Sequence, residues 1–257
     1  MVYTEIEVVA AATDLHSGIY GGVAPNPLMA LAEILTGLKD REGRVLIPGF
    51  YEGIDSPSDA ELTAWRELPF DPEAYREAEV GSTELIGEPG FNPLERLWAR
   101  PTLEVHGIRG GFVGDGAKTV IPAKAVAKVS MRLVPDMDAR KIAEAYQAHV
   151  ASLTPSGTRV ETRIMAAAPA AVVSTDNPFV RDAARAMHDT FGKDTVYIRS
   201  GGSIPVVGLF DDAGIPPVLM GFGLPDDNLH APNEKFHLPN FYAGIEAVGR
   251  YLEILGE

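Results

Sequence analysis

The chain has 257 residues, 46% of them hydrophobic, so it can bury the core of one large domain or of two ordinary ones. Its formal net charge of −14 argues against binding to nucleic acids or anionic membrane surfaces, because both select basic patches. The absence of cysteine excludes disulfides and thiolate metal sites, so any zinc must be held by His, Asp or Glu.

The first hundred residues predict a strand, a helix and a long insertion. Residues 2–9 are rich in β-branched side chains and predict a strand, which a glycine-rich loop follows at 16–22. The segment Pro25-Asn26-Pro27 then begins a helix. Its apolar residues recur at helical spacing: Leu28, Leu31, Leu35 and Leu38. Residues 48–100 are rich in Pro, Gly and acids, but their aromatic residues indicate an ordered insertion.

The next elements complete a recognisable order. Residues 102–108 and 125–134 predict strands, and in the second strand Lys128, Ser130 and Arg132 share the polar face. A helix follows with one apolar stripe: Ile142, Ala145, Tyr146, His149, Val150 and Leu153. Residues 158–165 predict the last strand. The order β-α-β-β-α-β predicts a ferredoxin-like domain at 1–168, with the insertion at about 48–100.

The Ala/Pro-rich stretch 166–171 is interpreted as a domain boundary. Beyond it the pattern predicts a helix lined by Phe179, Ala183, Met187 and Phe191, a strand at 195–198, a helix after a Gly-Gly-Ser turn, a strand at 217–222 and a final helix. Residues 169–257 are therefore predicted to form part of an α/β domain with a parallel sheet. The predicted fold class is α/β, with an α+β first domain.

No apolar run approaches the roughly 20 residues that a membrane helix needs. The N-terminal residues have no basic leader and do not have the form of a signal peptide. We therefore expect a soluble cytoplasmic protein that binds neither membranes nor nucleic acids.

The polar loop at 223–234 is the strongest local signal for chemistry. It follows a predicted buried strand, where α/β proteins place ligand sites, and it sets His230 among acids and amides. Neutral imidazole is the commonest nitrogen ligand of zinc, and nearby carboxylates can orient it. The alternative is a polar turn whose Asp and Asn side chains bond to their own backbone.

Three further residues have a possible role and an ordinary alternative. His16 lies on a glycine-rich loop, where it could donate to a substrate oxygen or be a surface histidine. Arg132 could clamp a carboxylate with two hydrogen bonds or be an exposed strand residue. The segment 199–205 joins a predicted strand to a helix. Its backbone N–H groups and the Ser203 hydroxyl suit a carboxylate, whereas the alternative is a tight turn that needs glycine.

Five segments, taken in order, resemble the carnosine dipeptidase group of the zinc aminoacylase/carboxypeptidase family of metallopeptidases. They are Asp-Leu-His-Ser-Gly at 14–18, Lys-Thr-Val-Ile-Pro at 118–122, Met-Arg-Leu-Val-Pro at 131–135, Gly-Gly-Ser-Ile-Pro at 201–205 and Asp-Asn-Leu-His-Ala-Pro-Asn-Glu at 227–234. The resemblance covers essentially the whole chain. It implies that residues 1–168 are the lid, or dimerisation, domain and that residues 169–257 are the C-terminal part of the catalytic domain.

The resemblance also implies roles for single residues. His230 corresponds to a metal ligand, and His16 to the lid histidine that reaches across a homodimer to polarise the scissile carbonyl. The substrate's backbone and C-terminal carboxylate are expected to be held by four residues: Thr119, Arg132 and Ser203, assisted by Arg199. The intact family enzyme holds two zinc ions, with manganese or cobalt as alternatives. It hydrolyses dipeptides or acylated amino acids through a metal-bridged hydroxide.

Two departures limit these expectations. Ser200 stands where the family usually has Glu. The chain contains no His-x-Asp pair, and the family's remaining ligands and its general base lie upstream of the lid. A catalytic zinc needs about three protein ligands, so this chain alone is expected to retain no complete metal site.

The sequence therefore predicts an incomplete part of a dipeptidase-type metallohydrolase, with a missing N-terminal catalytic segment as a partner. The alternative is a non-catalytic dimerisation or binding module that keeps the lid and a carboxylate-binding surface. If a catalytic segment is missing, the C-terminal part should expose an apolar face and an unpaired strand edge.

Overall fold

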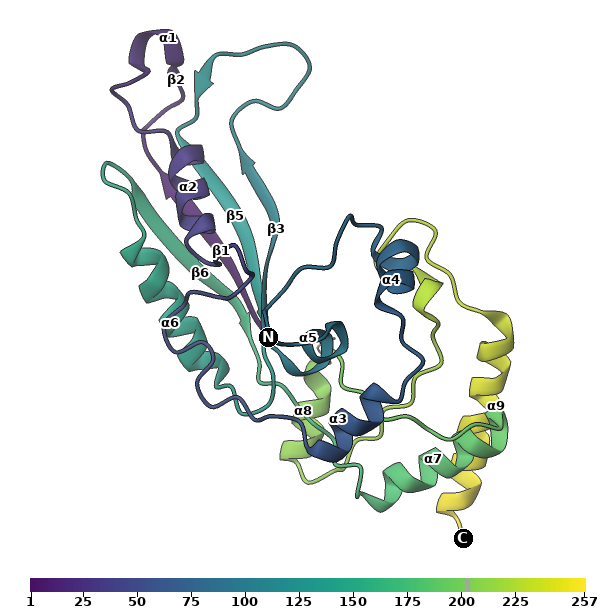
Figure 1. Ribbon diagram of the computed structural model, residues 1–257. Coiled ribbons are helices and arrows are strands. Elements are labelled where there is room, and N and C mark those ends of the chain that lie inside the picture. The colour runs from purple at the N-terminus through teal and green to yellow at the C-terminus, as the bar shows by residue number, and fades with distance from the viewer. Residues whose placement is uncertain (202–203) are drawn as a thin grey trace. The chain divides into compact units, whose positions relative to one another are not determined.

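The computed structural model describes residues 1–201 and 204–257, and the chain forms two compact units (Figure 1). Unit 1 consists mainly of Met1–Ser56 and Ile86–Ala170. Unit 2 consists of Pro57–Leu85, Ala171–Arg199 and Ile204–Glu257. Residues 57–85, which were predicted to be an insertion in the first domain, thus group with the C-terminal unit.

Unit 1 contains a four-stranded antiparallel sheet in the order β3-β5-β1-β6. The strands are β1 (Val2–Val9), β3 (Thr102–Gly110), β5 (Lys124–Arg132) and β6 (Arg159–Ala167). Helices α2 (Pro27–Thr36) and α6 (Ala139–Ser152) cover one face of this sheet, and α5 (Pro93–Ala99) belongs to the same unit (Figure 1). This is the ferredoxin-like topology that the element order predicted.

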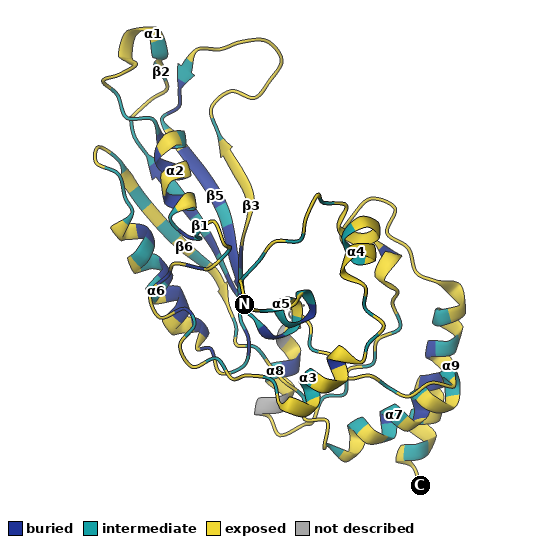
Figure 2. Ribbon diagram, in the orientation of Figure 1, coloured by how far each residue is buried: buried dark blue, intermediate teal, exposed yellow. Residues whose placement is uncertain are grey.

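Side-chain alternation along β1 places the core of unit 1. Val2, Thr4, Ile6 and Val8 are buried against the two helices, whereas the residues between them are half-buried on the opposite face. Figure 2 shows this core as the dark blue of β1 and β5. On the opposite face charged residues pair across strands, as in the ion pair of 2.8 Å between Lys124 and Glu7. The helices therefore cover the apolar face and leave a polar face open.

A buried phenol in this core makes the stability of unit 1 depend on pH. The Oη of Tyr146 lies 3.0 Å from the hydroxyl of Thr4, which donates to the carbonyl of Val129 at 3.0 Å. Burial raises the pKa of Tyr146 to about 12. In the unfolded chain the phenol ionises near pH 10, whereas in the folded chain it stays neutral up to about pH 12. The free energy of unfolding therefore falls by roughly 2–3 kcal/mol as the pH rises from 10 to 12.

Tyr146→Phe is expected to remove most of this alkaline loss. At pH 7 the variant should be less stable by about 1 kcal/mol, because the Thr4 hydroxyl loses a partner. Urea unfolding at pH 7 and pH 11.5 measures both effects, with the exposed Tyr242→Phe as control. An equal alkaline loss in the wild type and in Tyr146→Phe would contradict the assignment.

Unit 2 is built from helices and turns. Its elements are α3 (Asp59–Arg66), α4 (Pro72–Tyr75), a π-helical turn (Arg76–Val80), α7 (Pro178–Phe191), α8 (Pro205–Asp212), a 3-10 turn (Pro225–Asp227) and α9 (Leu238–Leu255). Helix α7 packs against α9 (Figure 1). The predicted helices of this part are confirmed.

The strands predicted at 195–198 and 217–222 are wrong, because both segments are irregular and the described part of unit 2 contains no strand. A strand needs backbone partners on a neighbouring segment, and a parallel strand needs neighbours joined through long crossovers. No described segment of unit 2 supplies such a partner. Residues 195–198 and 217–222 therefore have the composition of buried strands but lack the backbone hydrogen bonds to a neighbouring strand.

Unit 2 exposes many large apolar side chains, as predicted. On α9 alone the exposed residues include Leu238, Phe241, Tyr242, Ile245 and Leu252. Figure 2 shows α7 and α9 largely in the colour of exposed residues. The predicted unpaired strand edge is absent from the described residues of this unit. No helix in the described ranges is both long and apolar enough to cross a lipid bilayer.

Candidate functional site

His16 and Thr119 lie together at an exposed tip of unit 1. The short strands β2 (Leu15–His16) and β4 (Val120–Ile121) pair with His16 opposite Val120. The N–H of Ser17, which begins α1 (Ser17–Tyr20), donates to the carbonyl of Thr119 at 3.0 Å. The tip therefore joins two of the segments that the sequence singled out, as Figure 1 shows at β2 and α1.

The imidazole of His16 is oriented by its own loop. Its Nδ1 accepts a hydrogen bond of 3.0 Å from the N–H of Gly18. A ring nitrogen that accepts carries no proton, so the neutral ring holds its proton on Nε2. The side chain is exposed. His16 can therefore present Nε2–H as a donor to a group outside the tip.

Arg132 lies at the other end of the sheet from this tip. It is the last residue of β5, opposite Thr102, and it is half-buried. Strand β5 begins at Lys124, next to the tip, and spans about 26 Å at a rise of about 3.3 Å per residue. An extended dipeptide is only about 7 Å long, so His16 and Arg132 of one unit 1 cannot touch the same dipeptide.

Arg199 is held by an ion pair within unit 2. Its guanidinium donates to both carboxylate oxygens of Glu61, at 2.8 Å and 3.0 Å. Burial alone would raise the pKa of Glu61, but hydrogen bonds from Ser58 and Arg199 lower it below its ordinary value. The pair engages Nε and Nη2, so a substrate contact by Arg199 would use the remaining N–H groups of the guanidinium. Ser203, the neighbouring predicted site residue, lies outside the described residues.

Sequence reasoning missed Glu61 as the partner of Arg199. The available signal was the capping box at Ser58 and Glu61, which begins α3. That pattern predicts a helix start but does not predict which cation the carboxylate will meet 138 positions along the chain. The pair fastens residues 57–85 to residues 171–199.

The loop that carries His230 is ordered around Asp227. The Asp227 carboxylate is buried and accepts a hydrogen bond from the N–H of Leu224 at 2.7 Å. The backbone carbonyl of Asp227 accepts from the N–H of Lys235 at 3.0 Å. His230 is exposed with a left-handed φ of 61°, a conformation that histidine adopts more often than most residues. The predicted Asp-to-backbone bonding is thus real, and it coexists with an outward-facing imidazole.

The donors of this loop do not form a metal site on their own. In residues 1–201 and 204–257 no three His, Asp or Glu side chains gather closely enough to hold a metal ion. Asp226 is paired with Lys235, and the one oxygen of Asp227 without a hydrogen-bond partner, Oδ1, is buried. Because a zinc site needs about three protein ligands, His230 fits such a site only if other ligands come from outside this set.

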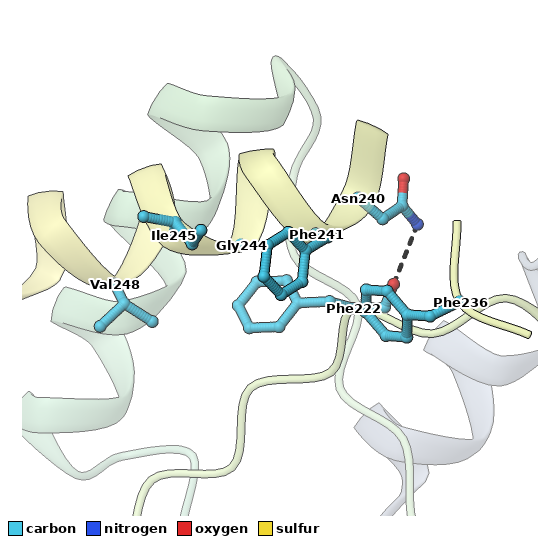
Figure 3. Close-up of a pocket in the computed structure, with 7 residues that line it drawn as sticks. All are labelled: Phe222, Phe236, Asn240, Phe241, Gly244, Ile245 and Val248. Carbon is cyan, nitrogen blue, oxygen red and sulfur yellow. Dashed lines mark hydrogen bonds between the residues drawn. The ribbon is translucent and has the colours of Figure 1, made fainter. Parts of the chain in front are cut away.

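A groove in unit 2 is apolar, and no ionisable side chain lines it. It is a groove of about 360 Å³ beside α9, lined by Phe222, Phe236, Asn240, Phe241, Gly244, Ile245 and Val248 (Figure 3). The Asn240 amide donates to the carbonyl of Phe222 at 2.9 Å. The groove is part of the exposed apolar surface and not a candidate for catalysis.

Unit 1 thus combines a ferredoxin-like sheet with an exposed histidine at its tip, and the polar loop of unit 2 carries one exposed imidazole. The family model described as "Peptidase dimerisation domain" matches residues 3–158. The chain belongs to the M20 metallopeptidase family.

The relatives are dipeptidases. The chain is 34% identical to "Cys-Gly metallodipeptidase DUG1" of Saccharomyces cerevisiae, over 99% of its own length and 54% of that protein. It is 30% identical to human "Beta-Ala-His dipeptidase", over 95% of its length and 49% of the relative. It also resembles the solved structures of the yeast di-peptidase Dug1p, with a TM-score of 0.89, and of human carnosine dipeptidase 1, with a TM-score of 0.87.

The match covers the chain but not the relatives. The structural match to Dug1p includes 98% of this chain and 53% of the Dug1p chain, at 33% sequence identity. The match to human carnosine dipeptidase 1 includes 100% of this chain and 55% of that chain, at 29% sequence identity. The chain therefore spans about half the length of the relatives that it matches.

Proposed function

We propose that this chain is part of a dipeptidase-type metallohydrolase that cleaves the peptide bond of dipeptides or of acylated amino acids. One observation carries the proposal, namely an exposed His16 at the tip whose Nδ1 accepts from Gly18, which leaves Nε2 to carry the proton of the neutral ring. A preorganised donor of this kind stabilises the charge that develops on a carbonyl oxygen during hydrolysis. The dipeptidase names of the relatives support the same reaction.

In this proposal the other residues bind substrate or metal. Thr119, Arg132 and Ser203 hold the substrate backbone and its C-terminal carboxylate, for which a guanidinium gives two parallel hydrogen bonds. Arg199 assists with the N–H groups that Glu61 does not engage. His230 is one ligand of a site for zinc, or for manganese or cobalt, whose remaining ligands are not brought together among residues 1–201 and 204–257. Residues 1–168 act as the lid, and 169–257 as part of the catalytic domain.

The proposed enzyme is a homodimer in which each tip serves the partner's site. The separation of about 26 Å along β5 supports this arrangement, because one lid cannot bring His16 and Arg132 to the same dipeptide. Strand β3 is the proposed contact. It pairs only with β5, and Val105 and Ile108 on it are exposed. Exposed apolar strand edges are ready to pair with another chain.

Ile108→Gln is expected to weaken the dimer. The substitution occurs twice in a symmetric interface, so a loss of about 1–2 kcal/mol per side raises the dissociation constant on the order of 30-fold or more. Analytical ultracentrifugation measures this constant. Met165→Gln, on the opposite edge strand β6, is the matched control and should leave it unchanged. If only the control weakens the dimer, the contact is β6 and not β3.

Hydrolysis of Cys-Gly and β-Ala-His in the presence of Zn²⁺ or Mn²⁺ tests the proposed activity. The chain is assayed alone and co-expressed with the polypeptide encoded immediately upstream of Met1, and the active form is called the reconstituted enzyme below. Activity that requires both parts, or that the chain has alone, supports the proposal. No hydrolysis of any dipeptide by either form contradicts it.

A non-catalytic binding module is the second candidate. It is favoured by the lack of a gathered metal-ligand set among the described residues. Such a module would dimerise and bind a peptide carboxylate, with no change in affinity on addition of zinc. Isothermal titration of a non-hydrolysable dipeptide, with and without zinc, separates the two candidates.

A further inference from the structure

Gly18 lies against the ring of His16. Its N–H donates to Nδ1 at 3.0 Å. A Cβ atom built on Gly18 would lie 2.9 Å from Cε1 of His16 and 3.2 Å from Nδ1, closer than side chains normally approach. The backbone of Gly18 is not in the left-handed region. A side chain at position 18 would therefore displace the His16 ring from the position it has here.

We propose that Gly18 is a positioning residue for His16. It fixes the neutral imidazole as the tautomer with its proton on Nε2, and its missing side chain leaves the space in which the ring lies. The inference rests on the proposed function, in which Nε2–H donates to the substrate carbonyl. It adds the group that decides which nitrogen holds the proton.

This tautomer restricts what His16 can do. A nitrogen that carries a proton has no lone pair in the ring plane, so Nε2 cannot bind a metal or accept a proton while Gly18 holds Nδ1. His16 is thereby a donor, in contrast to the metal-ligand role proposed for His230. The two histidines therefore have different proposed roles.

The rest of the loop keeps Gly18 in place. The Asp14 carboxylate accepts from the N–H of Ala123 at 2.9 Å, and the N–H of Ser17 donates to the Thr119 carbonyl at 3.0 Å. These two bonds fasten the chain on both sides of His16 to the segment around β4. In the motif Asp14–Gly18, Asp14 and Ser17 anchor the loop, and Gly18 orients the ring.

The tautomer can be read directly in the 257-residue chain. Long-range ¹H–¹⁵N spectra with ¹⁵N-labelled histidine, at a pH where the rings are neutral, distinguish protonated from unprotonated ring nitrogens. His16 is assigned by the signal that disappears in His16→Gln. We expect a protonated Nε2 and an unprotonated Nδ1. In Gly18→Ala the Nδ1–H form should increase on the order of fivefold, the equilibrium effect of one ordinary hydrogen bond.

Gly249→Ala, at an exposed position of α9, is the matched control, because a Cβ there would meet nothing within 4 Å. It should leave the His16 signals unchanged. A wild-type His16 with its proton on Nδ1, or a Gly18→Ala spectrum equal to the wild type, overturns the proposal. The wild-type spectrum decides even if Gly18→Ala folds poorly.

Kinetics separate this inference from the proposed function. In the reconstituted enzyme, Gly18→Ala should lower kcat about tenfold with little change in KM, because the donor acts mainly in the transition state. The expected tautomer together with no dipeptidase activity contradicts the proposed function alone. Full activity in Gly18→Ala despite a changed tautomer contradicts the positioning role.

Discussion

His230→Ala in the reconstituted enzyme is expected to lower zinc affinity by about 100-fold or more and to abolish measurable hydrolysis of dipeptides. Substitutions of residues that merely orient a ligand already cost 10–100-fold in metal affinity, and the loss of a ligand should cost at least as much. The imidazole is exposed on a loop ordered by Asp227, so its removal should not unfold unit 2. Metal content after dialysis against a weak chelator measures the effect without reference to activity.

His188→Ala is the control for this experiment. His188 is an exposed residue of α7 in unit 2, and its Nδ1 lies 3.1 Å from a carboxylate oxygen of Asp194. Its removal should change neither metal content nor hydrolysis. Retention of the wild-type zinc content by His230→Ala would show that His230 is not a ligand.

The fold of unit 1 could be predicted because its partners all lie within the chain. The alternation of Val2, Ile6 and Val8 with polar residues indicates a half-buried strand, and β5 and β6 supply both of its neighbours. Element order then leaves the ferredoxin-like topology as the simplest arrangement. Local pattern and long-range pairing agree, so the prediction and the structure coincide.

Unit 2 shows what sequence pattern alone does not decide. Residues 195–198 and 217–222 have the β-branched, apolar composition of buried strands, yet strand formation depends on hydrogen bonds to another segment. The amino-acid composition of a segment shows that it is suited to a buried strand. It does not show whether a neighbouring segment is present to form the backbone hydrogen bonds. Exposed Val196, Ile198 and Leu219 indicate that this environment is incomplete in the described chain.

The candidate site was found by the order of its motifs and not by their geometry. His16 and His230 were singled out with an ordinary alternative each, and Thr119 was identified only through the resemblance. The sequence did not predict that Glu61 holds Arg199, or that the N–H of Gly18 donates to Nδ1 of His16 at 3.0 Å. Both contacts depend on side-chain placement, which residue spacing does not encode.

His16→Ala in the reconstituted enzyme is expected to lower kcat by about 10²–10³-fold, because it removes a preorganised donor to the developing oxyanion. The KM should change little, since the contact is strongest in the transition state. Steady-state kinetics with Cys-Gly measure both values, and Tyr20→Phe at the same tip is the control. A variant that raises KM alone would indicate that His16 only binds the substrate.

Mixing two inactive variants tests whether the tip serves the partner's site. In a heterodimer of His16→Ala with His230→Ala, an exchange of tips places both defects in one site and leaves the other site intact. Random reassociation of equal amounts makes about half of the dimers mixed, so about one quarter of the wild-type activity should return. If each tip served its own subunit, every site would carry one defect, and mixing would restore nothing. The separation of about 26 Å between the ends of β5 favours the first outcome, because only a second lid can bring a histidine donor to a dipeptide held at Arg132.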